Sequence, residues 1–324
     1  MAIAIEHVIA ASSIKGVGRQ FLLRCIDDCS DASEINYENF VAFVAPEKHK
    51  RISRGAGSCN PQIEMKELKK AYDHTLKLLE RSADEKIFYI GSNSSKYPRR
   101  LRRCKDHPLF LFYRGNLEVC DTMRCAAVIG TRQPSADALK AEKKICDYLA
   151  EYGWNIVSGL AFGCDETAHR TAVEYWKNTG KGTTTAILAD GLDAGSIYPK
   201  ENAELADEIV DCGGLLLSEY IIGTTCRPYY LTERDKWQAQ LSDIVIPVQT
   251  GVAGGTFHAL TRAAELDIPS FIPYLREYDS PDCEQIDLCR KGMKKAVEKY
   301  KCRSFRTVLE LDGLSLFSVN NTIY

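Results

Sequence analysis

Residues 125–132, CAAVIGTR, and residues 155–169, NIVSGLAFGCDETAH, decide the fold that this sequence predicts. In each stretch a short apolar run, typical of a buried strand, ends at a glycine and small polar residues and gives way to a helical pattern. The loops at the carboxyl ends of parallel strands face helix N-termini, where backbone N–H groups bind anions. The two stretches therefore predict an anion-binding rim at one edge of a parallel sheet.

The same alternation of strand and helix continues to about residue 273. The sequence predicts strands at residues 126–129, 155–157, 184–189, 215–217, 244–248 and 270–272. It predicts helices between them at residues 137–152, 165–177, 201–210, 232–241 and 256–266. Repeated strand–helix units indicate a parallel sheet that is covered on both faces. We therefore predict the α/β class, with a Rossmann-like, doubly wound and mostly parallel sheet.

The chain divides into three predicted parts. Residues 1–60 are expected to form a small helical domain with a polar, glycine-containing linker at 46–61, residues 61–275 the Rossmann-like domain, and residues 276–324 a short C-terminal extension. In the first part, Lys15, Gly16 and Gly18 form either a hairpin between two helices that grips a DNA phosphate or an ordinary helix connection. The sequence leaves both interpretations open.

Charge and cysteine content limit the classes of function. The formal net charge is -2, so a nucleic-acid site would have to be a local patch. A basic segment supplies one candidate for such a patch, although a charge run is also typical of a solvated face: Lys96, Arg99, Arg100, Arg102, Arg103 and Lys105. The 13 cysteines contain no Cys-x-x-Cys pair, which favours reduced thiols and no metal site. Without a signal sequence or an apolar run of about 20 residues, we expect a cytoplasmic protein.

Cofactor and catalytic signatures are missing from the sequence. No Gly-x-Gly-x-x-Gly follows the first strand, and residues 180–182, GKG, lack the remaining residues of a P-loop. Asp165 is predicted to be a helix N-cap, and His169 to cap or pack locally. We therefore expect neither a cofactor nor catalytic residues. The predicted rim consists of loop residues that bind anions: Gly130, Thr131, Arg132, Ser158, Gly159, Gly163, Gly254, Gly255 and Thr256.

The order of several motifs resembles the DNA-processing protein A (DprA/Smf) family. The matching segments are Tyr97-Pro98, HPLFLFYRGN, VIGTR, IVSGLAFGCDETAH, DGLD followed by Tyr198-Pro199, LLSEY, ERDKWQAQLSD and AGGT, over about residues 87–273. This resemblance implies a homodimeric, non-enzymatic protein that binds single-stranded DNA without sequence preference and loads a RecA-type recombinase during natural transformation, a role in DNA recombination. It also implies phosphate contacts from Arg132, Lys200, Arg227, Arg234 and Lys236.

One departure from the family pattern identifies a divergent member. Asp235 stands between Arg234 and Lys236, where the family has an asparagine between two arginines. A carboxylate at this position weakens an anion site, because it repels phosphate.

Two other classes of function stay open. Related Rossmann-like phosphoribohydrolases bind a mononucleotide at a similar glycine loop, but their catalytic glutamate is replaced here by Phe257, His258 and Ala259. A nucleotide sensor without catalysis therefore remains an alternative to a hydrolase. A protein-interaction scaffold is the third possibility, since the net charge is near neutral.

Overall fold

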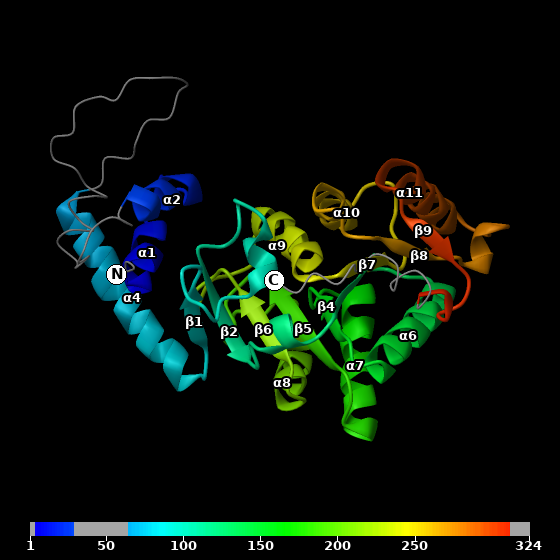
Figure 1. The fold of residues 1–324 in the computed structure, drawn as a ribbon, viewed down its shortest axis with the longest axis horizontal. Helices are drawn as coiled ribbons and strands as arrows, with labels where there is room; N and C mark the ends of the chain where they lie inside the picture. Colours follow the sequence, from blue (N-terminus) through cyan, green and yellow to red (C-terminus); the bar gives the residue numbers. More distant parts are fainter. Residues whose placement is uncertain (1–3, 29–63, 312–324) are drawn as a thin grey trace, which may run out of the picture. The chain divides into compact units, whose positions relative to one another are not determined.

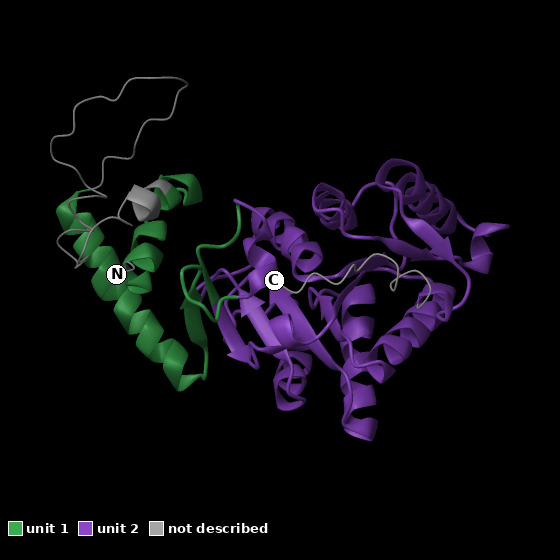
Figure 2. Cartoon of the chain, in the orientation of Figure 1, with its two compact units in different colours: residues 1–97, 106–111 green, residues 98–105, 112–324 purple. Residues whose placement is uncertain are grey.

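The computed structural model describes residues 4–28 and 64–311. The chain divides into two compact units, unit 1 with residues 1–97 and 106–111, and unit 2 with residues 98–105 and 112–324 (Figure 2). The linker predicted at residues 46–61 and the end of the predicted C-terminal extension lie outside the described residues.

Unit 1 is a helical body with one short strand. Its elements are α1 (Ile5–Ser12), α2 (Arg19–Asp28), α4 (Met65–Asp84) and β1 (Phe88–Gly91). Val8 of α1 and Leu68 of α4 share one apolar core, and the rings of His7 and Tyr72 stack with centroids 4.7 Å apart. The segment that contains Lys15, Gly16 and Gly18 connects α1 to α2, and Gly16 has the positive φ of 89° that a side chain disfavours.

Unit 2 is built on a twisted sheet with strands in the order β2-β6-β5-β4-β3-β7 (Figure 1). These strands are β2 (Phe110–Gly115), which begins in unit 1, β3 (Cys125–Ile129), β4 (Asn155–Ser158), β5 (Thr183–Leu188), β6 (Leu215–Ser218) and β7 (Ile244–Pro247). All neighbours pair in parallel except β2 and β6, which are antiparallel. The connecting helices are α5 (Val119–Thr122), α6 (Ala136–Glu151), α7 (Cys164–Thr179), α8 (Ala203–Asp211), α9 (Pro228–Leu241) and α10 (Thr256–Glu265), with short 3-10 helices η1 (Arg99–Arg103) and η2 (Lys200–Asn202).

Strand β3 shows why both faces of the sheet are covered. Ala126 and Val128 pack against α6 and α7, whereas Ala127 and Ile129 pack against α9 and α10. Successive side chains of a strand point to opposite faces, so an unbroken apolar run requires helices on both. Figure 1 shows α6, α7 and α8 on one side of the sheet and α9 and α10 on the other.

The order of the strands reverses at β3. From β3 the chain passes through β4, β5 and β6 in one direction along the sheet, and then returns to place β7 on the other side of β3. In open α/β sheets, ligands bind outside the carboxyl ends of the strands at such a switch point. The topology therefore predicts a ligand site at the loops that follow β3 and β7.

The C-terminal part of unit 2 adds a small second sheet and a helix. Strand β8 (Phe271–Pro273) pairs in parallel with β9 (Arg303–Phe305), and η3 (Arg276–Tyr278) and α11 (Glu284–Tyr300) lie between them in the chain. The predicted α/β class and the Rossmann-like, mostly parallel sheet are confirmed.

Among the described residues, no helix is both long and apolar enough to cross a membrane.

Candidate functional site

A pocket of about 440 Å³ opens at the switch point between β3 and β7. We call it the rim pocket. Residues from the β3–α6 loop, the start of α7, helix α9 and the β7–α10 loop surround it: Ile129, Gly130, Thr131, Arg132, Ala161, Asp165, Leu231, Thr232, Arg234, Asp235, Gln238, Thr250, Gly251, Ala253, Gly254, Gly255, Thr256 and His258. Thirteen residues were predicted to bind the ligand, namely the nine loop residues of the rim and the further cations Lys200, Arg227, Arg234 and Lys236. Seven of them line the pocket: Gly130, Thr131, Arg132, Arg234, Gly254, Gly255 and Thr256.

The β3–α6 loop is held tightly against its neighbours. Thr131 donates its backbone N–H to the Gln249 carbonyl over 2.8 Å and accepts from the Cys164 N–H over 3.2 Å. At Gly163, where φ is 79°, a Cβ would lie 2.7 Å from the Arg132 carbonyl oxygen. These contacts fix the backbone on both sides of Arg132, while its side chain is exposed and forms no ion pair with any described residue. Arg132 is therefore an exposed cation on a fixed loop, and its charge also acts on the Asp235 carboxylate.

The N-terminus of α10 forms the opposite side of the rim pocket. The helix begins at Thr256 after Gly254 and Gly255. Phe257 and His258 donate their N–H groups to the Gly254 and Gly255 carbonyls, whereas the N–H groups of Gly255 and Thr256 make no backbone hydrogen bond to a described residue. Unpaired N–H groups and the helix dipole attract an anion to such an end. Helix α11 supports this loop from behind, because Gly292 leaves no room for a Cβ beside the Thr250 and Gly251 carbonyl groups and Lys295 donates to the Val252 carbonyl over 2.8 Å.

Arg234 lines the buried side of the rim pocket. Its side chain is only 6% exposed, and its guanidinium lies 3.3 Å from Asp165 and 3.6 Å from Asp235. Gly159 must lack a side chain, because a Cβ there would overlap the Arg234 guanidinium. Arg234 is a buried, neutralised cation whose contacts hold the loops in place.

Asp165 has a different position from the one expected. The N-cap of α7 is Gly163, so the prediction that Asp165 caps the helix is wrong. The Asp165 carboxylate instead accepts the backbone N–H groups of Gly159 and Ala161 at 3.1 and 3.4 Å and pairs with Arg234. It joins the β4–α7 loop to α9, two elements that are distant in sequence.

Asp235 brings a negative charge to the same side of the pocket. Its carboxylate lies against Gly255, since a Cβ at that position would contact Asp235 Oδ2. Burial raises the pKa of Asp235, an effect that Arg234 partly opposes. The carboxylate thus occupies the neighbourhood of the helix end that would otherwise attract an anion.

Other titratable groups beneath the rim are shifted by burial. Burial raises the pKa of Asp190, at the end of β5, to about 7. His169 packs locally, as predicted, with Nδ1 2.7 Å from Thr184 Oγ1, and burial together with Arg234 lowers its pKa to about 3. A neutral, enclosed imidazole of this kind is a packing element and not a proton donor for a ligand in the pocket.

The remaining predicted rim residues lie outside the pocket lining. Ser158 is buried and donates its hydroxyl to the Val128 carbonyl over 2.7 Å, so it joins β4 to β3. Lys236 pairs with Glu233 over 2.7 Å. Lys200 and Arg227 are exposed on the loops that follow β5 and β6.

Three tyrosines form an aromatic surface before and within α9. The rings of Tyr220 and Tyr230 stack with centroids 3.9 Å apart, and the Arg227 guanidinium lies 5.7 Å from the Tyr230 ring. Tyr229 is 68% exposed. Tyr229 and Tyr230 are adjacent in the sequence, whereas the contact between Tyr220 and Tyr230 arises only because the fold brings the end of β6 to the start of α9.

His258 is a lining residue that sequence reasoning missed as a ligand group. It lies in the first turn of α10, directly after the glycine loop. Its position two residues after Thr256 is a usable signal, since side chains of the first turn surround an anion that binds a helix end.

The predicted basic segment divides into structural and exposed cations. Arg100 makes two hydrogen bonds to the Asp243 carboxylate, at 3.1 and 2.8 Å, and its side chain is 14% exposed. This ion pair therefore links η1 to Asp243, the residue before β7. Arg99 lies 3.6 Å from Asp121, whereas Arg102, Arg103 and Lys105 are exposed in unit 2 and Lys96 is exposed in unit 1.

Comparisons with known proteins agree with the motifs and the fold. Residues 88–287 match the model of the family described as DNA recombination-mediator protein A. The DNA processing protein DprA of Bacillus subtilis is 30% identical over 199 residues, which are 61% of this chain and 64% of that protein. The chain spans about two thirds or less of the length of the curated relatives that it matches.

Two solved structures share this architecture. DNA processing protein A from Streptococcus pneumoniae superimposes with a TM-score of 0.73 at 22% identity, covering 97% of this chain and 98% of that one. DNA processing protein A from Helicobacter pylori, whose structure concerns a single-stranded DNA binding mode, gives a TM-score of 0.59 at 25% identity, covering 70% of this chain and 95% of that one. The first likeness establishes the fold over nearly the whole chain.

Proposed function

Because this chain belongs to the DNA recombination-mediator protein A family, we propose that it binds single-stranded DNA through the backbone phosphates, without reading the bases. One observation supports this most directly. The exposed Arg132 and the N-terminus of α10 line the same pocket at the switch point of the sheet. A guanidinium and a helix N-terminus are both suited to phosphate. The relative from H. pylori has a described single-stranded DNA binding mode.

The proposed path of the strand follows the rim. One phosphate lies between Arg132 and the N–H groups of Gly255 and Thr256. Lys200, Arg227 and Lys236 contact neighbouring phosphates, and exposed Arg103 and Lys105 extend the basic surface. Bases stack on Tyr229 or Tyr230, because any base has an aromatic face that an exposed ring can bind.

Binding rather than catalysis is the role that we propose for the pocket. Its two carboxylates, Asp165 and Asp235, both form ion pairs with Arg234, at 3.3 and 3.6 Å. A general acid or base needs an accessible proton and a substrate within hydrogen-bond reach. The described residues around the pocket fit phosphate binding better than proton transfer.

Salt dependence provides the test of this function. If about five phosphates are neutralised, a plot of log affinity for a single-stranded oligonucleotide against log salt should have a slope of about -3 to -4. The measurement is fluorescence anisotropy at several salt concentrations, with duplex DNA and mononucleotides as competitors. An affinity that does not change with salt would contradict the proposal. Competition by a mononucleotide alone would favour the nucleotide-sensor alternative, which the pocket volume of about 440 Å³ permits.

Replacing Asp235 by asparagine is expected to tighten DNA binding. The substitution removes a negative charge beside Gly255 and leaves Arg234 paired with Asp165. We expect an affinity about five-fold higher at neutral pH, equivalent to about 1 kcal/mol. Because burial raises the pKa of Asp235, the wild-type affinity should approach that of the variant as the pH falls and the carboxyl becomes protonated. Anisotropy titrations at pH 8 and pH 5.5 check this, and an equal or weaker affinity of Asp235→Asn at pH 8 would show that the carboxylate does not oppose the ligand.

The likeness to the family also favours two macromolecular partners. We propose a homodimer and a RecA-type recombinase as partners, in a recombination-mediator role. Light scattering of the purified protein would measure the dimer, and recombinase filament formation on DNA coated with a single-strand-binding protein would measure the loading activity.

A further inference from the structure

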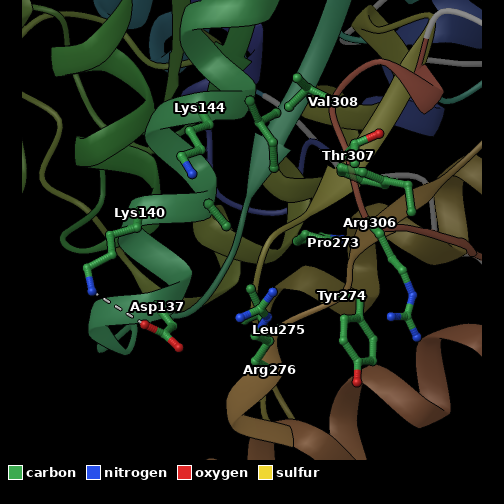
Figure 3. A pocket seen from close by; sticks show the side chains of 13 residues that line it. Asp137, Lys140, Lys144, Pro273, Tyr274, Leu275, Arg276, Arg306, Thr307 and Val308 are labelled. Carbon is green, nitrogen blue, oxygen red and sulfur yellow. Dashed lines mark ion pairs between the residues drawn. The ribbon is translucent and has the colours of Figure 1, made fainter.

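A second pocket of unit 2 lies between α6 and the segments around β8 and β9 (Figure 3). We call it the α6–β9 pocket. Its volume is about 420 Å³, in the range of pockets that bind small organic ligands. Figure 3 shows Asp137, Lys140 and Lys144 on the α6 side, and residues 273–276 and 306–308 on the opposite side.

The floor of this pocket is apolar. Ile145, Leu275 and Phe305 line it and are buried members of the main core of unit 2. Val308 packs against the same cluster. A flat group with apolar faces, such as a nucleobase, can be buried against this floor. Removing its apolar surface from water stabilises the bound state.

The sides of the pocket are cationic. Lys140 and Lys144 lie one helical turn apart on α6, and Arg276 and Arg306 lie on the opposite side. Lys140 is 3.5 Å from Asp137 in an exposed pair, which contributes little. Among the described residues, no carboxylate lies within ion-pair distance of Lys144, Arg276 or Arg306. Three of the four cations therefore form no ion pair with a described carboxylate.

Arg306 is held in place by aromatic stacking. Its guanidinium lies 4.2 Å from the centre of the Tyr274 ring, and Tyr274 donates its hydroxyl to Asp279 over 2.5 Å. The backbone N–H of Arg306 donates to Glu310 over 3.1 Å. A guanidinium that is already positioned loses less conformational freedom when it binds a phosphate.

The α6–β9 pocket adjoins the rim through a shared loop. Glu277, next to Arg276, accepts hydrogen bonds from Ser135 Oγ at 2.7 Å and from Gln249 Nε2 at 2.8 Å. Ser135 lies three residues after Arg132, and Gln249 immediately precedes the rim residue Thr250. Residues 131–137 thus separate the two pockets, with Arg132 in one lining and Asp137 in the other.

We propose that the α6–β9 pocket binds one nucleotide, with its base against Ile145 and Leu275 and its phosphate toward the sides of the pocket, which carry Lys144, Arg276 and Arg306. The nucleotide belongs either to the strand that leaves the rim or to a free nucleoside phosphate, and both offer the same base and phosphate. The first source rests on the proposed function, since it needs a strand in the rim pocket. The apolar floor beside the cations favours a nucleotide over an acidic peptide as the ligand.

Photo-crosslinking followed by peptide mass spectrometry tests this site. The probes are single-stranded oligonucleotides with 5-iododeoxyuridine at successive positions, and free 5-iododeoxyuridine monophosphate. We expect a crosslink to the peptide that contains Tyr274, with at least one of the two probes. In the Lys144→Glu variant the yield of this crosslink should fall at least five-fold, while the yield of crosslinks to rim peptides should not change. Lys181→Glu, at an exposed lysine before β5, is the matched control and should leave both sets unchanged.

The outcomes distinguish this site from the rim. A Tyr274 crosslink from the oligonucleotide identifies a strand that continues from the rim, whereas one from the monophosphate alone identifies a free nucleotide and supports the pocket even if the rim binds no DNA. Crosslinks confined to rim peptides would overturn the α6–β9 site and leave the proposed function intact. Absence of crosslinks throughout the protein would overturn both.

Discussion

Replacing Arg132 by alanine is expected to lower the affinity for single-stranded oligonucleotides by about ten- to a hundred-fold at low salt. Hydrogen bonds to charged groups contribute about 1.5–3 kcal/mol each, and Arg132 is an exposed cation on a fixed loop of the rim pocket. The slope of log affinity against log salt should become shallower by about 0.7, since one phosphate contact is lost. Anisotropy titrations at three or more salt concentrations measure both quantities.

Arg170→Ala is the matched control for this experiment. Arg170 is an exposed arginine of unit 2 that pairs with Glu166 on α7 and does not line the rim pocket. Its removal changes the net charge equally, so it should alter the affinity less than two-fold and leave the slope unchanged within about 0.2. Equal losses in both variants would mean that Arg132 contributes only through overall charge. Arg132→Ala that binds as the wild type does would remove the basis for the proposed site.

Replacing Arg234 by methionine is expected to destabilise the protein by about 3–5 kcal/mol, because it leaves Asp165 and Asp235 without the cation that they surround. The effect on DNA binding should be secondary, through loss of the loop geometry. Urea denaturation followed by circular dichroism measures the free energy of unfolding. It should be combined with anisotropy under conditions in which the variant is folded.

Lys236→Met is the control for that variant. Lys236 is two residues away on α9, and its ion pair with Glu233 is partly exposed, so its loss should cost less than about 1 kcal/mol. If Arg234→Met were as stable as the wild type and yet failed to bind DNA, Arg234 would contact phosphate directly, as its motif position implies.

The expected loss of affinity in Arg132→Ala and the expected loss of stability in Arg234→Met distinguish two layers of the same site, a surface layer and a buried one. Arg132 and the N-terminus of α10 form the surface that meets the ligand, whereas Arg234, Asp165 and Gly159 form the buried support that fixes their loops. Asp235 belongs to both layers, because it pairs with Arg234 and also lies against Gly255. A substitution in the support therefore changes stability first, and one at the surface changes affinity first.

The sequence by itself determined β3 to β7 of the main sheet, their order along the chain and the loops that follow them, whereas the structure places the strand predicted at residues 270–272 in the separate sheet of β8 and β9. These features follow from local patterns. An apolar run such as residues 125–129 predicts a strand buried on both faces, and the glycine that follows it predicts the turn into a helix. Arg132 could be chosen as a site residue because it immediately follows that turn.

Only the tertiary structure decided which charged residues are available to a ligand. Asp165 and Arg234 are 69 residues apart in sequence, and Arg100 and Asp243 are 143 apart, yet each pair is in contact. The availability of a cation depends on its nearest carboxylates and on its burial, and neither has a local pattern in the sequence. The α6–β9 pocket was likewise not foreseen, because its cations come from α6, η3 and the end of β9, which the fold alone brings together.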